Sequence, residues 1–281
     1  MQQELDLVHK ALHSVLQKLT TELESAGISY WLDFGTCLGA IRQQDFIPWD
    51  DDVDIAILRS DAPRFTQVVL EKLSGLVDIS VQSINRPIAV PVKLELKGFH
   101  VIEEHMESKG VPSWLHPNIG IDVFLIDSRK RKPNQILRIF RHLLAKMWQA
   151  KQIEDWIGKA SSGFSPFWRK FKYAMVRPVS RQFLCKLIDL EIKLNCSVEE
   201  SRFLVHGVDC EFEYLVHDSK AVFPLKKTAF RQSNFAIPQE QVSYLDRIYG
   251  ADFMQPPISS KRLTHSSQLL IASDSPLVDI D

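Results

Sequence analysis

A short acidic segment at residues 46–57 constrains this chain more than any other part of its sequence. Three aspartates follow Phe46-Ile-Pro-Trp49, and Asp52-Val-Asp-Ile-Ala-Ile57 then alternates like a β-strand. Strand residues two apart face the same way, so the Cα atoms of Asp52 and Asp54 are expected about 6.5 Å apart. Carboxylates this close repel one another unless a positive charge lies between them. Their oxygens suit Mg²⁺ or Mn²⁺, although the pattern also fits solvated charges at a strand edge.

Two further features are expected beside this acidic pair. Asp122 lies in the apolar run Gly120-Ile-Asp-Val-Phe-Leu-Ile-Asp127, which predicts a buried strand and a rigidly held third carboxylate. The Gly35-Thr36 turn offers backbone N–H groups and a hydroxyl to a phosphate, and Arg42 adds a planar donor fork. Each also has an ordinary structural reading, as a turn or helix cap for Thr36 and as a surface ion-pair partner for Arg42.

The hydrophobic periodicity predicts a mixed α/β (α+β) sheet flanked by helices. Apolar residues recur at helical spacing over residues 3–26, and Gly27 follows as a stop signal. A second helix is expected from Ala62 to about Leu73, with Asp61 as its N-cap. The predicted strands span 28–34, 52–57, 77–81, 90–96 and 120–127.

Other segments are expected to be less regular. The first strand should end at Gly35-Thr36, in a loop that carries Arg42. Residues 98–117 read as irregular, and the C-terminal part reads as loops and short elements wrapped on a core.

Composition sets the broad class of protein. With 281 residues, of which 45% are hydrophobic and 25% charged, the chain is long enough for a sizeable core. Its four cysteines form no CxxC pair, which excludes zinc-ribbon spacing and fits a reducing compartment. The N-terminus lacks signal-peptide character, and no stretch approaches the roughly 20 apolar residues of a spanning helix. We therefore expect a cytoplasmic protein, free or peripheral at the inner face of the membrane.

Charge is distributed unevenly along the chain. The formal net charge is −1, yet residues 129–186 hold 15 Lys or Arg and two acids, so this region carries +13 and the remainder −14. An apolar helical stripe runs from Ile136 to Met147, and a second helical pattern spans roughly 167–194. The region fits a solvated basic face, or contact with an anionic membrane surface or lipid-linked glycan. Nucleic acid is not expected, because no nucleic-acid-binding motif is present.

Two longer strings connect these observations to a known family. Tyr30-Trp-Leu-Asp-Phe-Gly-Thr-Cys-Leu-Gly-Ala-Ile-Arg42 and Phe46-Ile-Pro-Trp-Asp-Asp-Asp-Val-Asp54 closely resemble the LicD family. That family includes bacterial phosphocholine transferases and resembles animal fukutin and fukutin-related protein. The resemblance continues in the strand at Gly120 and in C-terminal strings such as Phe223-Pro-Leu-Lys-Lys227, and it leaves 128–205 unmatched.

The resemblance implies a nucleotidyltransferase-like fold in one domain over 1–281, with 129–195 as a basic helical insertion. It assigns Gly35 and Thr36 to a phosphate turn, Asp52 and Asp54 to a metal pair, and Asp122 to the third carboxylate. From the C-terminal part, Lys226, Arg262 and His265 are expected to close over the donor.

The implied activity is transfer of a phospho-alcohol, such as phosphocholine, from a CDP-linked donor to a sugar hydroxyl of a cell-surface glycan or lipopolysaccharide. CMP would be released, with Mg²⁺ or Mn²⁺ as cofactor. The general base is expected among the aspartates, at Asp122 or Asp127, although Asp127 fits a loop cap equally well. Lys93 fits a surface-facing strand lysine better than a diphosphate ligand. The alternatives are a nucleotidyltransferase acting on a nucleoside triphosphate and an inactive glycan-binding relative.

Overall fold

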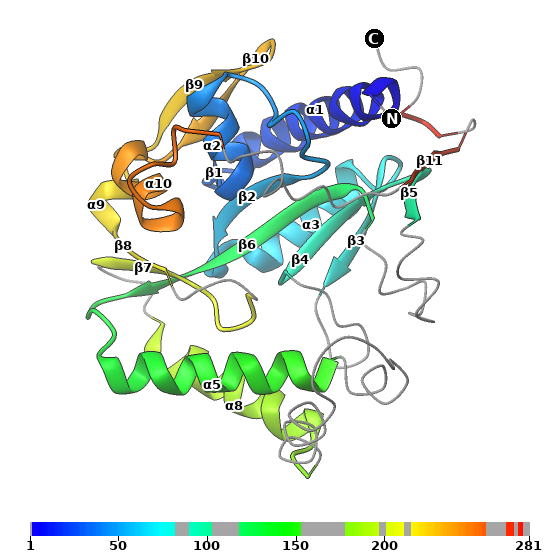
Figure 1. Cartoon of the computed structure of the whole chain (residues 1–281). Helices are drawn as coiled ribbons and strands as arrows, with labels where there is room; N and C mark the ends of the chain where they lie inside the picture. The colour runs from blue at the N-terminus through cyan, green and yellow to red at the C-terminus, as the bar shows by residue number, and fades with distance from the viewer. Residues whose placement is uncertain are drawn as a thin grey trace, which may run out of the picture.

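The computed structural model of the chain centres on a mixed seven-stranded sheet (Figure 1). It describes residues 2–81, 90–102, 118–152, 178–196, 201–210, 215–256, 268–272 and 275–277. The strand order is β1-β2-β6-β4-β3, and β7 extends the sheet from β6 to β8. β2 and β6 run parallel, and the other described pairs are antiparallel. The strands are β1 (Tyr30–Leu32), β2 (Val53–Leu58), β3 (Val77–Val81), β4 (Val92–Leu96), β6 (Gly120–Arg129), β7 (Phe203–His206) and β8 (Val216–Asp218). The predicted mixed α/β class is confirmed.

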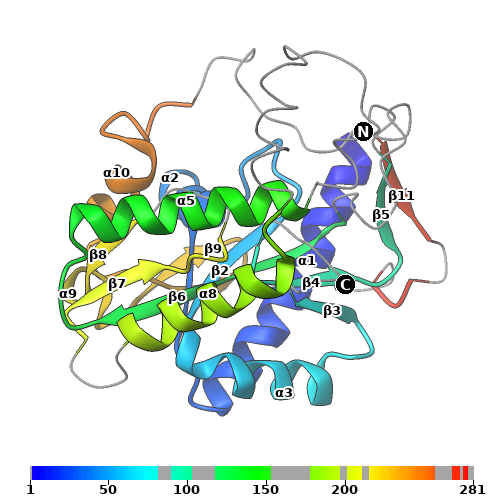
Figure 2. The same ribbon diagram turned by 90° about the horizontal axis from the view of Figure 1, so that it is seen from below.

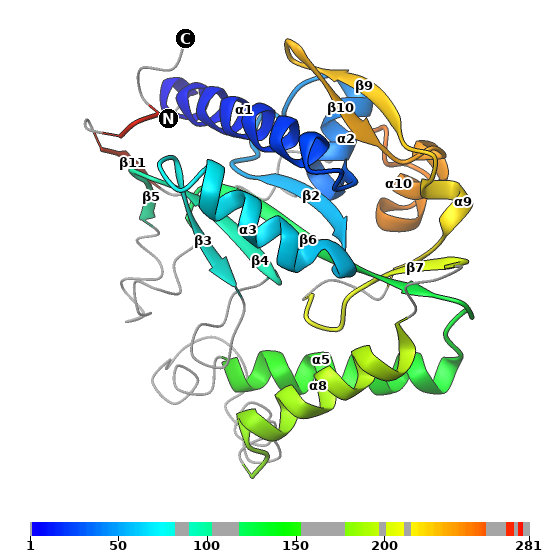
Figure 3. The same cartoon turned by 180° about the vertical axis from the view of Figure 1, so that it is seen from behind.

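Helices α1 (Gln2–Ser25) and α3 (Ala62–Lys72) lie over one face of this sheet (Figure 3). Strand side chains alternate between faces, so Ile55 and Val123 join the apolar core under these helices. The neighbouring Ala56 and Phe124 point to the other face and pack with Tyr244. The predicted first helix is confirmed, and Gly27 follows it with a φ of +65°.

The segment after β1 differs from the prediction, because Phe34–Arg42 is a helix, α2, and not a loop. The Asp33 side chain accepts a hydrogen bond from the Phe34 N–H at the start of this helix. Two glycines in nine residues hide the helical signal in the sequence. One of them is required by packing, since a Cβ at Gly39 would lie 2.5 Å from the Asp45 carbonyl oxygen.

Two smaller predictions need correction. Asp61 is the N-cap residue of α3, as predicted, but its side chain makes no capping hydrogen bond and accepts one from Arg64 instead. Part of the segment expected to be irregular is strand β5 (Phe99–Ile102), which pairs with β11 (Gln268–Ile271). The partner strand lies about 170 residues away in sequence, beyond the reach of local patterns.

The C-terminal part consists of short elements, as expected. They are α9 (Ser219–Val222), the hairpin of β9 (Lys226–Phe230) and β10 (Ser233–Ile237), and α10 (Gln241–Tyr249). The 3-10 turn η1 (Arg59–Asp61) lies earlier in the chain, between β2 and α3. Together with α2, α10 covers the sheet face opposite α1 and α3 (Figures 1 and 3).

Between β6 and β7 the chain forms α5 (Gln135–Gln152) and α8 (Arg181–Asn195), which lie side by side (Figures 1 and 2). The limits of the predicted insertion stay a prediction. Among the described residues, no helix has both the length and the apolar character needed to cross a bilayer. The helical stripe predicted from Ile136 to Met147 packs only in part: Leu144 is buried and Met147 packs beside it, whereas the residues from Ile136 to Leu143 on this stripe are exposed. Ile136 is 79% exposed, whereas Arg141 is 1% exposed.

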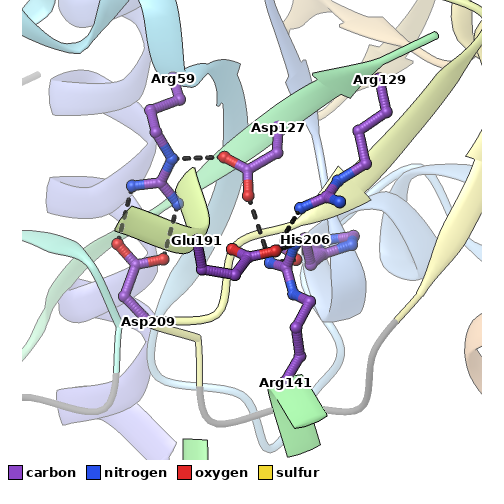
Figure 4. A network of polar contacts seen from close by, with 7 residues as sticks. All are labelled: Arg59, Asp127, Arg129, Arg141, Glu191, His206 and Asp209. Atoms are coloured by element: carbon purple, nitrogen blue, oxygen red, sulfur yellow. Dashed lines mark hydrogen bonds and ion pairs between the residues drawn. The ribbon is translucent and has the colours of Figure 1, made fainter. Parts of the chain in front are cut away.

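A buried ion-pair network explains this orientation of α5 (Figure 4). Arg141 donates to Asp127 on β6 at 3.2 Å and to Glu191 on α8 at 2.9 Å. Arg129 reaches the same glutamate at 2.7 Å. Arg59 pairs with Asp127 and forms a two-pronged contact with Asp209. Three arginines thus meet three carboxylates, and the network joins both helices to the sheet.

We predict that Arg141→Leu will strongly destabilise the protein. The substitution leaves Asp127 and Glu191 short of a buried counter-charge, a defect that costs about 3–5 kcal/mol in comparable buried pairs. Urea unfolding measures the change. The matched control is Arg138→Leu, an exposed site on the same helix, where the free energy of unfolding should change by no more than about 0.5 kcal/mol. Equal stabilities of the two variants would contradict a structural role for the network.

Candidate metal and phosphate site

Three carboxylates predicted from the sequence to lie together do so in the structure. β2 and β6 pair in parallel with Asp54 directly opposite Asp122. Asp52 immediately precedes β2, and one carboxylate oxygen from each of the three residues lies within 4.8 Å of the others. Asp50, Asp51 and Asp52 form a second such group. Clusters of hard oxygen donors of this size fit Mg²⁺ or Mn²⁺.

The first turn of α2 holds Asp54 in place. The Gly35 N–H donates to the Asp54 carboxylate at 3.1 Å, and the Thr36 hydroxyl accepts from the Asp54 backbone N–H at 2.8 Å. Phe34 adopts a φ of +33°, an uncommon conformation for a non-glycine residue, immediately before this contact. Gly35 and Thr36 therefore lie at the site, with these groups turned toward Asp54. Their predicted contact with a phosphate stays a prediction.

Close approach of the acidic loop explains why residue 35 is glycine. A Cβ at this position would lie 2.8 Å from an oxygen of the Asp50 carboxylate and 3.5 Å from one of Asp54. Any side chain would therefore push the loop away from the start of α2.

Lys93 is the site residue that sequence reasoning placed wrongly. It lies opposite Asp122 in the antiparallel pairing of β4 with β6. Its ammonium group is 2.6 Å from the Asp122 carboxylate, and both side chains are only 14% exposed. The expected surface-facing lysine is thus part of the cluster. The alternation of VKLEL (92–96) predicts a polar face, and only the pairing with β6 reveals that this face carries the carboxylates.

The pKa values follow from burial and from mutual repulsion. Burial, then the charges of Asp52 and Asp122, raise the pKa of Asp54 well above its usual value. Burial and the neighbouring Asp52 do the same to the pKa of Asp50. Burial alone would lower the pKa of Lys93, but the negative charge of Asp122 and its neighbours outweighs burial and raises it. The cluster is therefore a region of strong negative potential that attracts cations.

More distant residues support this arrangement. On α1, the His9 ring lies 2.7 Å from the Asp50 carbonyl oxygen and stacks on Phe46. Both contacts hold the acidic loop against α1. Behind α2, the wholly buried Asp33 carboxylate accepts from the Tyr244 hydroxyl at 2.7 Å and lies 2.9 Å from His206. These contacts join the acidic loop to α1, and they join the start of α2 to α10 and β7.

Tyr249 lies near the carboxylates, whereas Arg42 lies at the end of α2 away from Gly35. Burial and the nearby charge of Asp54 raise the pKa of Tyr249, the last residue of α10, although its side chain is 44% exposed. Arg42, in the last turn of α2, donates to Gln43. Burial lowers the Arg42 pKa, and the charge of Tyr249 opposes this shift. Sequence patterns alone do not single out Tyr249.

The remaining predicted residues have different outcomes. Asp127 is enclosed by Arg59 and Arg141, whose charges outweigh the effect of burial and lower its pKa. It is therefore not a candidate general base. Lys226 is exposed on β9, and no contact among the described residues joins it to the cluster. Arg262 and His265 lie outside the described residues.

Comparison with known proteins places this geometry in a family. Residues 27–106, which include Asp52, Asp54 and Lys93, match the family described as "LicD/FKTN/FKRP, nucleotidyltransferase domain". The chain is thus related to the LicD family. Human ribitol 5-phosphate transferase FKRP is 39% identical over 69 residues, which are 25% of this chain and 14% of that protein.

Two further LicD relatives extend the comparison. The lipopolysaccharide cholinephosphotransferase LicD of Haemophilus influenzae is 54% identical over 41 residues, 15% of this chain and 16% of that protein. Human ribitol-5-phosphate transferase FKTN is 26% identical over 167 residues, 54% of this chain and 36% of that protein. The matched segments therefore span at most 36% of these three relatives.

We predict that Asp54→Asn will stabilise the metal-free protein and weaken its response to metal. The amide keeps the shape and the acceptor for Gly35, but it removes one repelling charge, worth on the order of 1 kcal/mol for each unit of pKa shift. Thermal unfolding with and without Mn²⁺ measures both effects. Mn²⁺ should raise the melting temperature of the wild type by several degrees and that of the variant by less.

The pH dependence has a defined sign. Because the folded pKa of Asp54 is raised, its contribution to stability is fully present below the unfolded pKa of about 3.9 and is lost as pH rises through the folded value. The stability advantage of Asp54→Asn without metal should therefore grow with pH. Asp78→Asn, at a site 70% exposed, is the matched control. It should change neither the stability without metal nor the rise in melting temperature that Mn²⁺ causes. Equal Mn²⁺ responses in all three proteins would rule out metal binding at Asp54.

Proposed function

We propose that this chain is a metal-dependent transferase. It moves a phospho-alcohol, such as phosphocholine, from a CDP-linked donor to a sugar hydroxyl of a cell-surface glycan or lipopolysaccharide, and it releases CMP. The observation that carries the proposal is the convergence of Asp52, Asp54 and Asp122, with Lys93 beside them, on adjacent strands. The FKRP and FKTN relatives are ribitol 5-phosphate transferases and the LicD relative is a cholinephosphotransferase, which supports the same reaction class.

The three carboxylates are suitable ligands for a divalent cation. Asp52, Asp54 and Asp122 would hold Mg²⁺ or Mn²⁺, which when bound supplies positive charge to the diphosphate and to the leaving oxygen. The raised pKa of Asp54 fits this role, because a carboxylate repelled by its neighbours gains most from a cation. The first turn of α2 keeps Asp54 oriented through Gly35 and Thr36.

The reaction needs positioning and charge neutralisation more than covalent help from the protein. The sugar hydroxyl oxygen forms a bond to the phosphorus that carries the alcohol. The bond from this phosphorus to the bridging oxygen breaks, and CMP leaves with the electron pair. The hydroxyl proton passes to a carboxylate of the cluster, with Asp122 as the candidate.

The positive groups around the cluster would bind the donor. Lys93 is fixed at the carboxylates and would neutralise a phosphate oxygen there. Arg42, at the end of α2, would contact the diphosphate or the nucleotide. Lys226 and Arg262, from the C-terminal part, would add further positive charge for the donor.

A second candidate reaction is transfer of a nucleoside monophosphate from a nucleoside triphosphate. It is favoured by the description of the matching family as a nucleotidyltransferase domain. A catalytically inactive glycan-binding relative is the third candidate. The intact set of three carboxylates argues against it, since binding of a neutral glycan does not require such a cluster of like charges.

We predict metal-dependent release of CMP from one of CDP-choline, CDP-ribitol and CDP-glycerol. The assay compares Mn²⁺, Mg²⁺ and EDTA, and calorimetry measures donor binding in case the acceptor is missing. Asp52→Asn should abolish turnover without unfolding the protein. If no CDP donor binds in the presence of metal and a nucleoside triphosphate does bind, the proposal of phospho-alcohol transfer is wrong and nucleotidyl transfer takes its place.

We predict opposite effects of Lys93→Met on metal and donor. The ammonium group competes with a cation for Asp122, so its removal should tighten Mn²⁺ binding about tenfold or leave it unchanged. It should weaken donor binding by about tenfold or more, because one charge-assisted contact is lost. Calorimetry measures both constants.

The matched control for this lysine is Lys97→Met. Lys97 lies just beyond β4, donates to the Ser74 carbonyl at 2.6 Å and is 36% exposed. Both binding constants should stay at wild-type values in this variant. Unchanged donor affinity in Lys93→Met would remove Lys93 from the donor site.

A further inference from the structure

α5 presents large apolar side chains to the solvent. Ile136 is 79% exposed, Ile139 55%, Phe140 44% and Leu143 56%. Their spacing of three and four residues places them on one side of the helix. This stripe faces outward because Arg141 and Leu144 occupy the packed side.

α8 repeats this arrangement. Its buried residues include Leu184 and Ile188, whereas three large apolar side chains are at least half exposed: Phe183 at 54%, Leu190 at 50% and Leu194 at 72%. Both helices direct a charged residue into the same network, Arg141 from α5 and Glu191 from α8 (Figure 4). The exposed apolar residues of both therefore lie on sides turned away from that network. We call these seven residues, together with the exposed basic residues around them, the outer face.

The exposed charges of the outer face are almost all positive. Within the described parts of 129–196 the only exposed acid is Asp189. The exposed basic residues beside these apolar groups are Lys130, Arg131, Lys132, Lys146, Lys186 and Lys193, and Arg138 lies on another side of α5. Aliphatic chains interleaved with Lys and Arg are typical of helices that lie in a membrane interface. Their apolar groups enter the acyl boundary, while the basic groups stay at the level of the headgroups.

Other occupants fit this surface less well. A second copy of the chain would bring two positive surfaces together, and like charges repel. Nucleic acid would match the charge, but single strands are bound by aromatic stacking, and five of the seven exposed apolar side chains are aliphatic. An anionic bilayer matches both the charge and the aliphatic groups.

We propose that the outer face of α5 and α8 docks on an anionic phospholipid bilayer. This inference is independent of the proposed reaction, because it uses neither the carboxylate cluster nor a donor. If both hold, the bilayer would orient the enzyme toward an acceptor attached to lipid.

Flotation of the full chain with vesicles tests the proposal. One set contains phosphatidylcholine alone, and the other contains phosphatidylcholine and phosphatidylglycerol in equal parts. The wild type should float with the anionic vesicles at low salt and much less with the neutral ones, and added salt should weaken binding. The double substitution Ile139→Asp with Leu143→Asp should lower vesicle affinity about tenfold or more, because it removes two inserting groups and adds two repelled charges.

Matched variants separate docking from folding. Leu70→Asp makes the same kind of change on α3 at a side chain that is 54% exposed, and it should float like the wild type. The milder pair Ile139→Ser with Leu143→Ser should also lose affinity, and its thermal unfolding should match that of the wild type. Lys146→Glu should reduce binding to anionic vesicles only.

Three results would overturn the proposal. The first is no flotation of the wild type with anionic vesicles at low salt. The second is flotation of the Ile139/Leu143 variants equal to that of the wild type. The third is sedimentation showing a wild-type dimer that these variants abolish, because the outer face would then bind a second copy. None of these results bears on CMP release, so failure here leaves the proposed function intact.

Discussion

The parallel pairing of β2 with β6 is the constraint on which the candidate site depends. Its register sets Asp54 opposite Asp122, and the antiparallel pairing with β4 then adds Lys93 on the other side of Asp122. Such a concentration of carboxylates works against folding, since burial and mutual repulsion both disfavour the charged forms. Several separate elements oppose that cost. The first turn of α2 supplies two hydrogen bonds to Asp54, α1 contacts the acidic loop through His9, and β4 supplies an ammonium group.

The sequence predicts the parts of this site that depend on local periodicity. Strand alternation is enough to place Asp52 and Asp54 on one side, because they are close in the chain. Strand alternation does not reveal which strands are neighbours. Asp122 was expected from its buried apolar strand, a place that the family resemblance also assigns, but the place of Lys93 was missed. α2 was missed for a different reason. Its short length and two glycines give little helical signal, and burial of Cys37 and Leu38 against the rest of the fold determines its conformation.

Strand alternation separates Asp127 from the carboxylate cluster. It is five residues from Asp122 on one continuous strand, so the two side chains point to opposite faces of the sheet. Asp127 therefore belongs to the ion-pair network with Arg59 and Arg141, where two cations hold its pKa low. The same strand thus provides a carboxylate for chemistry on one face and a carboxylate for assembly on the other. A candidate base should be tested first against the alternation of its own strand.

The orientation of α5 connects the ion-pair network to the surface of the protein. Apolar periodicity would turn the side with Ile139 and Leu143 inward, and the sequence offers no signal against this. The ion-pair network instead turns the side with Arg141 inward, because Asp127 and Glu191 are buried and require this cation beside them. Burial of one cation on α5 therefore exposes four large apolar side chains among lysines and arginines. Exposed apolar area on this scale is unfavourable in water, and it becomes favourable only where the helix meets an apolar phase. The electrostatics of the interior thus create a surface whose composition matches an anionic bilayer.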